Sequence, residues 1–449
     1  MLVVAALGIT WILDGLEVTI VGSIGPMLRS PQTLGLSMGD IGTAGSAYLL
    51  GGILGALFFG RLTDQLGRRA IFTATLAVYI FAVLGTACSW NAWSFVLFRA
   101  ITGFAIGGEY AAINSTIDEL IPARVRGRVD LIVNGSFWIG AAMGAVAALL
   151  MTAHGISTHG WRFGFAAGGV LAFGVLFLRH WVPESPRWLV SHGRAAEAEA
   201  AMRQIEHWVE TATGHRCPPV YVTSTVHPRR SFGYRLINRA MMRDYKLRSA
   251  LALTLMVAQA FLYNAVFFTY AGVLDKFEHV PASAIGWFIL PLAVGNVVGP
   301  IALGPLFDTV GRRRMVFFSY GMSALLMLVV AALFAGGHLT ATTQTAGWMA
   351  IFFFASPAAS AAYLTASEIF PLEARAVAIS VFYVLGTLIG GLGAPYLFAR
   401  LIGYDTPGPL SLGYAFAALL MLLAGLMALF CGVDAENKSL EQIARPLSG

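Results

Sequence analysis

A polar hairpin that occurs twice between apolar segments is the feature that most constrains how this chain folds. It runs from Gly60 to Phe72 as GRLTDQLGRRAIF and returns from Gly304 to Phe317 as GPLFDTVGRRRMVF. Asp64 and Asp308 are 244 residues apart, and the glycine three residues after each aspartate keeps the same offset. A polar hairpin repeated at half the chain length, each time between hydrophobic segments, indicates a duplicated membrane bundle.

The composition agrees with a membrane protein, because 57% of the 449 residues are hydrophobic and only 12% are charged. Lipid is the natural solvent for so much apolar surface. Twelve apolar segments are long enough to cross about 30 Å of hydrocarbon as helices. We predict an all-α membrane protein with two pseudo-symmetric six-helix bundles. The expected spans are 3–28, 39–62, 70–89, 92–119, 128–153, 161–182, 248–274, 283–306, 315–336, 345–368, 376–402 and 411–433.

Several function classes lack support in the sequence. The three cysteines are scattered, without the spacing of a disulfide framework or a metal site. The net charge of +6 comes from arginines that punctuate hydrophobic runs, so nucleic-acid binding is a poor explanation for it. No phosphate-binding loop follows a strand, which argues against an ATP-driven pump. We expect no enzymatic activity, no cofactor and no metal.

The first residues, MLVVAALGIT, are already apolar, so a cleaved signal peptide is the competing interpretation. Asp14 and Glu17 lie inside this run, and its removal would break the two-fold repeat. We therefore count it as the first span. We expect that the start of the chain is short or mis-assigned and that a cytoplasmic leader precedes it.

Arginine placement predicts the orientation. One set of turns carries clusters such as Arg68–Arg69, Arg124–Arg128 and Arg312–Arg314, whereas the alternate turns hold few basic residues. The arginine-rich side is expected to face the cytoplasm. An even number of spans then places both termini on that side of a cytoplasmic (inner) membrane.

The duplication sets the expected domain boundaries. These are an N-terminal bundle, 1–190; a cytoplasmic connector, 191–247; a C-terminal bundle, 248–435; and a tail, 436–449. Within the connector, apolar residues recur at helical spacing from Arg194 to Thr213. This pattern favours an amphipathic helix at the membrane surface, with a solvated linker helix as an equal alternative.

Four ionisable residues fall inside predicted spans, where each needs a partner or a purpose because its insertion costs about 2.5–3.5 kcal/mol. They are Asp14, Glu17, Arg99 and Glu109. A carboxylate that alternates between an ion pair with arginine and a protonated state could couple proton binding to conformational change. Glu17 and Arg99 are the first choice for such a pair, and Asp14 or Glu109 could be the proton site instead. The alternative is structural: an ion pair that tethers two helices, and a packing hydrogen bond for Asp14.

Uncharged polar residues in the second half are candidates for substrate binding. Gln259, Tyr263, Asn264 and Tyr363 carry amide or phenol groups that can bind a polyol or a carboxylate. Their alternative role is to hold helices together through hydrogen bonds, which is the safer interpretation for Tyr263.

The motifs resemble those of the major facilitator superfamily. GRLTDQLGRR is similar to its loop between the second and third helices, and PESPRWL from Pro183 resembles a sugar porter motif. The Gly107-Gly108-Glu109 segment and the DGLE segment from Asp14 look more like those of metabolite:proton and aromatic-acid:proton symporters. The sugar porters' acidic residue in helix 1 and arginine in helix 4 match Glu17 and Arg99. Three sugar-contacting positions depart from that pattern, with Ala141, Ala258 and Tyr363 in their places.

The resemblance implies that charged groups near the hairpins latch the two halves on the cytoplasmic face and release during transport. Glu119 and Arg126 have counterparts 249 residues later, Glu368 and Arg375. The expected gate residues are Gly60, Asp64, Gly67, Arg68, Arg69, Glu119, Arg126, Glu184, Arg187, Asp308, Gly311, Arg312, Glu368 and Arg375. We expect the two aspartates at helix ends near water, where they accept hydrogen bonds from arginines or from the N-terminus of a neighbouring helix. The alternative is that the arginines only fix the loops inside.

These observations favour a secondary transporter that works by alternating access, with a proton-coupled symporter of a small polar metabolite as the leading hypothesis. The substrate would be an organic acid or a sugar-like compound. The expected partners are this substrate, protons and the lipid bilayer, with no nucleic acid and a monomer as the working unit. A proton-driven efflux antiporter, an uncoupled facilitator and a non-transporting nutrient sensor are the alternatives.

Overall fold

Long apolar helices dominate the computed structural model. It describes residues 2–153, 160–178, 183–216, 234–267, 269–404, 406–445 and 447, so parts of the expected connector and tail lie outside the described residues. Twelve helical segments within these ranges are long and apolar enough to cross a membrane. No strand occurs in the described ranges, and the predicted all-α fold is confirmed.

Each half supplies six spans. Those of the first half are α1 (Leu2–Ser23), α3 (Met38–Leu66), α4 (Arg68–Ala87), α5 (Ala92–Leu120), α6 with α7 (Arg126–Gly135 and Phe137–Ala153) and α8 (Gly160–Leu178). Those of the second half are α12 with α13 (Lys246–Phe267 and Tyr270–Lys276), α14 (Ala282–Thr309), α15 (Arg312–Ala335), α16 (Ala341–Glu368), α17 with α18 (Arg375–Gly386 and Gly393–Gly403) and α19 (Pro407–Cys431). Short elements complete the chain: α2 (Gly25–Leu28), α9 (Pro186–Ser191), α10 (Ala195–Thr213), α11 (Tyr234–Arg239), α20 (Leu440–Ile443), the 3₁₀ turns Ala123–Val125 and Leu372–Ala374, and the π-helical turns Ala240–Asp244 and Thr387–Gly391.

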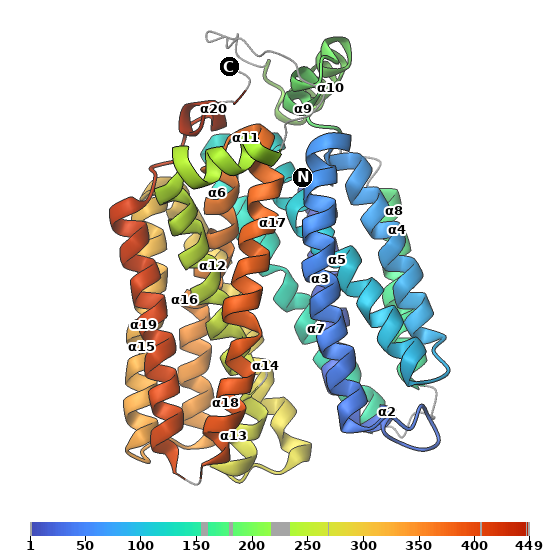
Figure 1. The fold of residues 1–449 in the computed structure, drawn as a ribbon, viewed down its shortest axis with the longest axis vertical. Helices are drawn as coiled ribbons and strands as arrows, with labels where there is room; N and C mark the ends of the chain where they lie inside the picture. The colour runs from blue at the N-terminus through green and yellow to red at the C-terminus, as the bar shows by residue number, and fades with distance from the viewer. Residues whose placement is uncertain are drawn as a thin grey trace.

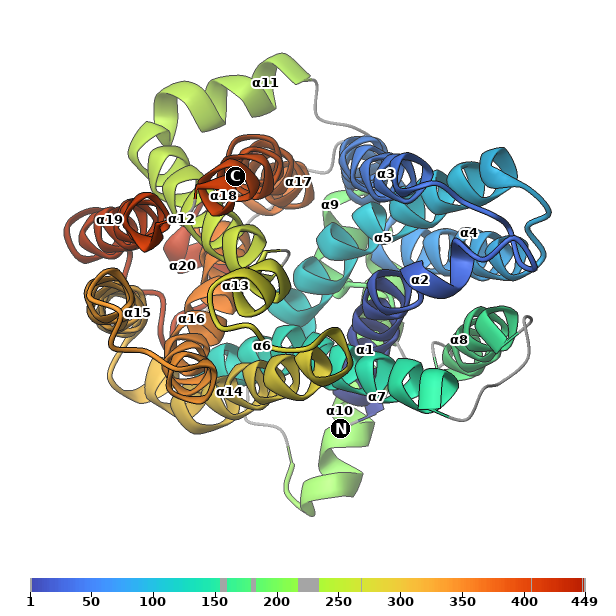
Figure 2. The same cartoon turned by 90° about the horizontal axis from the view of Figure 1, so that it is seen from below.

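The two halves form two bundles that lie side by side (Figures 1 and 2). Each bundle has its own large apolar core, one built around residues such as Phe95 and Trp161 and the other around Phe352 and Tyr414. The bundles meet where α6 packs on α14 and α16, and where α3 and α5 pack on α17. We call the end that holds both hairpins, α9 and α10 the connector end; α2 and α13 lie at the opposite end (Figure 1).

Glycines let helices within each bundle approach closely at equivalent places. A Cβ atom on Gly55 of α3 would overlap the carbonyl of Phe104 on α5. In the second bundle, a Cβ on Gly299 of α14 would overlap the carbonyl of Phe353 on α16. Small residues at such contacts bring the backbones together and compensate for the missing hydrophobic drive in lipid.

The repeated hairpins turn at their glycines. Gly67 and Gly311 have φ values of 97° and 112°, a region that L side chains rarely adopt. Gly67 alone separates α3 from α4, and Val310 with Gly311 separates α14 from α15, so that in both turns the glycine directly precedes the next helix. The arginines expected in these turns therefore open helices, and the predicted span 70–89 begins too late, because α4 starts at Arg68.

Other predicted span ends also shift. The span expected from 128 begins with the turn Ala123–Val125 and α6, so that Arg126 lies in the first helical turn. The expected span 3–28 is divided, with α1 ending at Ser23. The predicted connector helix lies in α10, which ends at Gly214 in a left-handed conformation. Hydropathy places spans well but locates their ends poorly, since polar residues that cap a helix belong to its first turn.

We predict that Gly55→Ala destabilises the purified protein by about 1–3 kcal/mol, because the added methyl group must push α3 away from α5. The measurement is thermal unfolding in detergent. Gly45→Ala on the same helix is the matched control, since no atom lies within 4 Å of its added Cβ. Equal melting temperatures for the two variants would contradict the close-packing argument.

Candidate functional site: a cavity between the bundles

A cavity of about 230 Å³ lies between the two bundles. The first half lines it with Trp11, Val18, Tyr48, Leu49, Tyr110, Asn134, Phe137 and Trp138. The second half lines it with Gln259, Ala260, Tyr263, Asn264, Ser356, Ala359, Ser360, Tyr363, Tyr383 and Thr387. All four residues expected to bind substrate are in this set, and their role in binding remains a prediction.

Aromatic rings from both halves stack around the cavity. Tyr110 stacks on Tyr383 with ring centroids 4.6 Å apart and on Tyr363 at 5.9 Å. The edge of Trp11 meets Tyr110 at 4.7 Å, and Trp138 stacks on Tyr263 at 5.4 Å. Such a wall presents aromatic ring surface to a bound molecule, with polar groups at a few positions around it.

Some polar groups of the cavity are already occupied by the protein. The hydroxyl of Tyr263 donates to Oδ1 of Asn296 at 2.6 Å, in keeping with a packing role. The amide nitrogen of Asn264 donates to the carbonyl of Ala260 at 2.7 Å. Gln259, in contrast, makes no hydrogen bond to the described part of the chain and keeps its whole amide available to a ligand.

Glu17 of α1 and Arg99 of α5 form a buried ion pair beside this cavity. The guanidinium of Arg99 also lies over the ring of Tyr48, 4.6 Å from its centroid. Because Tyr48 lines the cavity, the ion pair is one side chain away from a bound molecule. A change in the charge of Glu17 would therefore change the electrostatic potential at the cavity wall, because Arg99 and Tyr48 lie between them.

Asp14 and Glu109 lie close enough to Glu17 to form one acidic cluster in the first bundle. Asp14 interacts electrostatically with both Glu109 and Glu17, and all three carboxylates are buried. Thr75 of α4 faces the carboxyl group of Glu109. Arg99 pairs with Glu17 alone among these three carboxylates, so the cluster can hold at least one proton at low cost.

At the connector end, each half caps a helix of the other. The carboxylate of Asp308 accepts hydrogen bonds from the backbone N–H groups of Gly127 and Arg128, both at 2.9 Å, in the first turn of α6. Asp64 accepts from the N–H of Val377, at 3.3 Å, in the first turn of α17. The two aspartates thus stabilise the positive helix ends that lie across the interface.

Buried ion pairs join the same two halves. Arg126 pairs with Glu368 at 3.2 Å, and Arg375 pairs with Glu119 at 3.3 Å. Within each half, arginines extend the network, with Arg68 bonded to Glu119 and Arg312 to Glu368. The expectation that Asp64 and Asp308 lie near water is wrong for Asp308, which is buried because the bundles close against each other at this end.

Two further carboxylates cap the helices that follow the hairpins. Glu184 accepts from the N–H of Arg68 at 2.9 Å and from that of Arg69 at 3.3 Å, and Glu436 accepts from the N–H of Arg312 at 3.3 Å. Burial raises the pKa of Glu184.

Close packing extends across the halves, since a Cβ on Gly60 would overlap the hydroxyl of Ser380.

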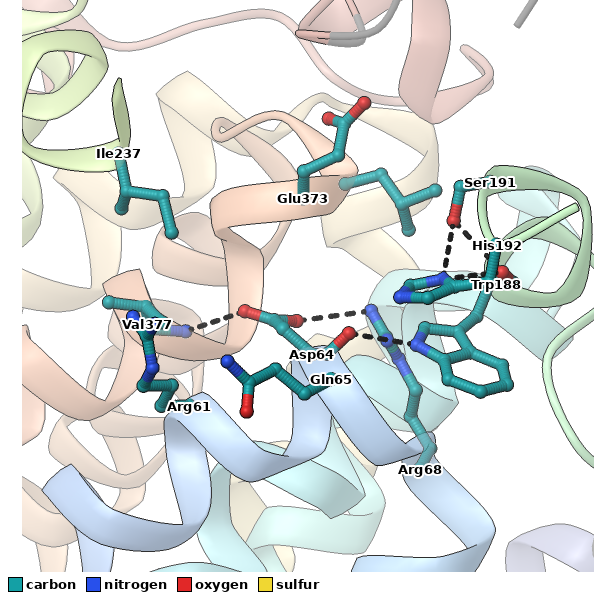
Figure 3. A pocket seen from close by; sticks show the side chains of 11 residues that line it. Arg61, Asp64, Gln65, Arg68, Trp188, Ser191, His192, Ile237, Glu373 and Val377 are labelled. Carbon is teal, nitrogen blue, oxygen red and sulfur yellow. Dashed lines mark hydrogen bonds and ion pairs between the residues drawn. The ribbon is translucent and has the colours of Figure 1, made fainter. Parts of the chain in front are cut away.

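Segments outside the spans complete the connector end. Arg187 of α9 pairs with Glu441 of α20 at 2.7 Å and donates to the carbonyl of Glu119 at 2.9 Å. The indole of Trp188 donates to the carbonyl of Asp64 at 2.9 Å, and Figure 3 shows Asp64 between Trp188, Arg68 and Val377. The gate residues predicted from the motifs are therefore close together here, and their action as a latch remains a prediction.

Sequence reasoning missed several residues of the site. The aromatic residues Trp11, Tyr48, Tyr110 and Tyr383 give no signal in a hydropathy pattern, because their facing depends on how each helix is rotated. Two carboxylates at the connector end, Asp118 and Asp130, were also missed. Both are charged residues inside or beside predicted spans. The same criterion identified Asp14 and Glu109, and it could have identified these two residues as well.

Comparisons with known proteins agree with this geometry. The model of the "Sugar (and other) transporter" family matches residues 20–447. The niacin transporter NiaP of Acinetobacter baylyi is 26% identical over 97% of this chain and 94% of its own, and a gallate transporter of Pseudomonas putida is 28% identical over 92% and 88%. The fold is similar to that of the proton:xylose symporter XylE, with a TM-score of 0.80, 19% identity and coverage of 98% of both chains. The chain therefore belongs to the sugar (and other) transporter family of the major facilitator superfamily, and it is a membrane transporter.

Proposed function

We propose that this protein imports a planar aromatic carboxylate together with a proton across the cytoplasmic membrane. The aromatic wall of the cavity is the observation that carries the substrate class. The buried pair Glu17–Arg99 beside that wall supports the coupling to protons. Of the two classes that the sequence left open, organic acids fit this cavity better than sugars.

The balance between aromatic rings and free polar side chains in the cavity distinguishes organic acids from sugars as substrates. A sugar needs several free hydrogen-bonding side chains, but those of Tyr263, Asn264 and Ser356 are engaged with protein groups. A planar acid needs aromatic rings to pack against, and those of Tyr110, Tyr363 and Tyr383 line the cavity. Niacin and gallate, the compounds for which two relatives are named, are both planar aromatic carboxylates.

Arg99 provides the link between the proton and the substrate. While Glu17 is ionised it neutralises Arg99. When Glu17 takes up a proton, the guanidinium keeps its charge, because arginine does not release its proton in practice. The free positive charge next to Tyr48 then attracts a carboxylate into the cavity. Asp14 or Glu109 can store the proton during exchange, since both lie in the same acidic cluster.

Alternating access would proceed by opening the connector end. Ion pairs and helix caps join the halves there, with Asp308 of α14 capping α6 and Asp64 of α3 capping α17. We propose that this end faces the cytoplasm, which follows from the clustered arginines, and that both termini lie on that side. The protein would act as a monomer in the lipid bilayer, with the closed connector end holding substrate until the gate opens.

We predict that Glu17→Gln abolishes accumulation driven by a pH gradient. In proteoliposomes that are acidic outside, a gradient of one pH unit corresponds to about 1.4 kcal/mol, so one proton supports about tenfold accumulation of an acid anion. The wild-type protein should approach this limit with nicotinate, and Glu17→Gln should only equilibrate it. The measurement is radiolabelled uptake with an internal pH dye.

Glu199→Gln is the matched control, because this carboxylate on α10 is largely exposed. It should accumulate nicotinate like the wild type. Undiminished accumulation in Glu17→Gln would contradict the coupling role of this residue. Proton movement opposite to that of the substrate would indicate an antiporter, and no proton movement an uncoupled facilitator.

We predict that Tyr363→Ala weakens binding of an aromatic acid by about threefold to tenfold, through loss of stacking. Tyr363→Phe keeps the ring and should bind within about twofold of the wild type, on the same argument. Titration calorimetry with nicotinate, gallate, benzoate and xylose measures the dissociation constants. Equal losses of affinity in both variants would show that the phenol hydroxyl matters and would contradict stacking as the source of affinity. A preference for xylose would contradict an aromatic substrate.

A further inference from the structure

Two carboxylates at the connector end take no part in the coupling described above. Asp118 of α5 and Asp130 of α6 are both 0% exposed. None of their four carboxylate oxygens accepts a hydrogen bond from the described residues. Ser367 faces Asp118, Asn134 faces Asp130, and the nearest ion-pair contact of Asp118 is Nε of Arg375 at 3.9 Å.

Most of the positive charges around this pair are committed to other carboxylates. Within the described part of the chain, buried ion pairs at this end join four arginines with five carboxylates, and Asp130 is a sixth carboxylate outside these pairs. The arginines are Arg68, Arg126, Arg312 and Arg375, and their partners are Asp64, Asp118, Glu119, Asp308 and Glu368. An ionised carboxylate without a partner is costly to bury, whereas a protonated one is not.

Neighbouring helices place charges of both signs around the pair. Asp130 senses Asp118 on α5, Glu368 on α16 and Arg312 on α15. Asp118 senses Arg375 on α17, Arg126 on α6 and Glu368. Asp308 on α14 contacts the first turn of α6. The remaining neighbours of α6 are α1, with Asp14 and Glu17 of the acidic cluster; the turn Ala123–Val125, with Arg124; and α7, which has no charged residue.

The internal repeat shows that the ion-pair frame does not need these carboxylates. At the offset of 249 residues that relates Glu119 to Glu368, the counterpart of Asp118 is Ser367 and that of Asp130 is Ile379. The second half thus builds the same arginine–glutamate frame with an alcohol and an apolar side chain. The two acids are additions of the first half, which points to a role beyond packing.

The pair also adjoins the substrate cavity. Asn134 lines the cavity, and its amide nitrogen donates to Oδ1 of Asn114 at 3.2 Å and to the carbonyl of Asp130 at 3.0 Å. One helical turn therefore separates the cavity wall from Asp130. On the other side of the pair lie the ion pairs that hold the two bundles together.

We propose that Asp118 and Asp130 form a proton-binding site that holds one proton while the connector end is closed and releases it when this end opens to solvent. The proposal rests on the alternating-access part of the proposed function and is independent of the substrate. A shared proton removes one negative charge from the closed interface. Opening admits water, which stabilises both ionised carboxylates and lets the proton leave.

The sign of the pH dependence follows. At low pH the pair carries its proton, and the closed gate is stable. As the pH rises the proton is lost, and two buried like charges beside Glu368 repel each other, so the open gate is favoured. Asn at either position removes this repulsion, and such a variant should stay closed at high pH.

The test measures the distance between the halves at the connector end. Cysteines introduced at Leu66→Cys and Val310→Cys occupy exposed, repeat-related positions on the two halves. They are spin-labelled after replacement of the native Cys88, Cys217 and Cys431 by serine. Pulsed dipolar spectroscopy on the full chain in lipid nanodiscs then gives the closed-to-open ratio across a pH titration, without added substrate.

We expect the ratio in the otherwise native protein to fall with pH by up to about tenfold per unit, the limit for release of one proton. Asp130→Asn and Asp118→Asn should flatten this slope and remain closed in alkali. Asp244→Asn, a change at an exposed carboxylate of the same end, should keep the native slope. Native slopes in both pair variants, or variants that stay open at every pH, would overturn the proposal.

A second readout detects the proton directly. Infrared difference spectra between acid and alkali should contain the carbonyl band of a protonated carboxyl group, and this band should shrink in Asp130→Asn and in Asp118→Ser. Asp118→Ser introduces the residue that the second half has at the equivalent position, Ser367. We therefore expect this variant to fold. An unchanged band in both variants would contradict the site.

Glu109→Gln separates this proposal from the proposed function. If that variant keeps the pH-dependent distance while the native protein transports nicotinate without proton movement, the proposed symport fails and the proton-binding site stands. If Glu109→Gln alone removes the pH dependence, the acidic cluster controls the gate and the role of Asp118 and Asp130 is wrong.

Discussion

The burial of charge and of helix N-termini between two separate bundles is the interaction on which the rest of this structure depends. Asp308 caps α6 from the second half, and Asp64 caps α17 from the first. Loss of one partner from a buried ion pair typically costs about 3–5 kcal/mol. Closure at the connector end is therefore stable only when both bundles are aligned, which makes it suited to an all-or-none gate.

Much of the fold could be predicted from the sequence, because span length and arginine placement follow directly from the properties of a bilayer. The hairpin repeat identified the two-fold organisation, and the acidic and basic residues inside spans identified Glu17 and Arg99 as partners to consider. Helix rotation could not be predicted, since these spans are apolar on nearly all faces. For that reason the sequence does not predict the aromatic wall around Tyr110. Which rings face the cavity is determined by how the helices pack.

The two bundles share a frame but differ in chemistry. The first bundle holds the acidic cluster with Arg99 and also Asp118 and Asp130, whereas the second contributes amides, phenols and small residues to the cavity. At equivalent positions the repeat replaces acids by Ser367 and Ile379. Duplication thus supplies the symmetric closure, and divergence of the first half supplies the groups that can exchange protons.

The helix caps have a consequence for the solvent. In the proposed opening of the connector end, the N–H groups of Gly127, Arg128 and Val377 lose their carboxylate partners and must bond to water. The ion pairs around Glu119 and Glu368 must be hydrated as well. The open form therefore binds more water than the closed form, so that osmotic pressure from an excluded solute acts as a closing force on this transporter.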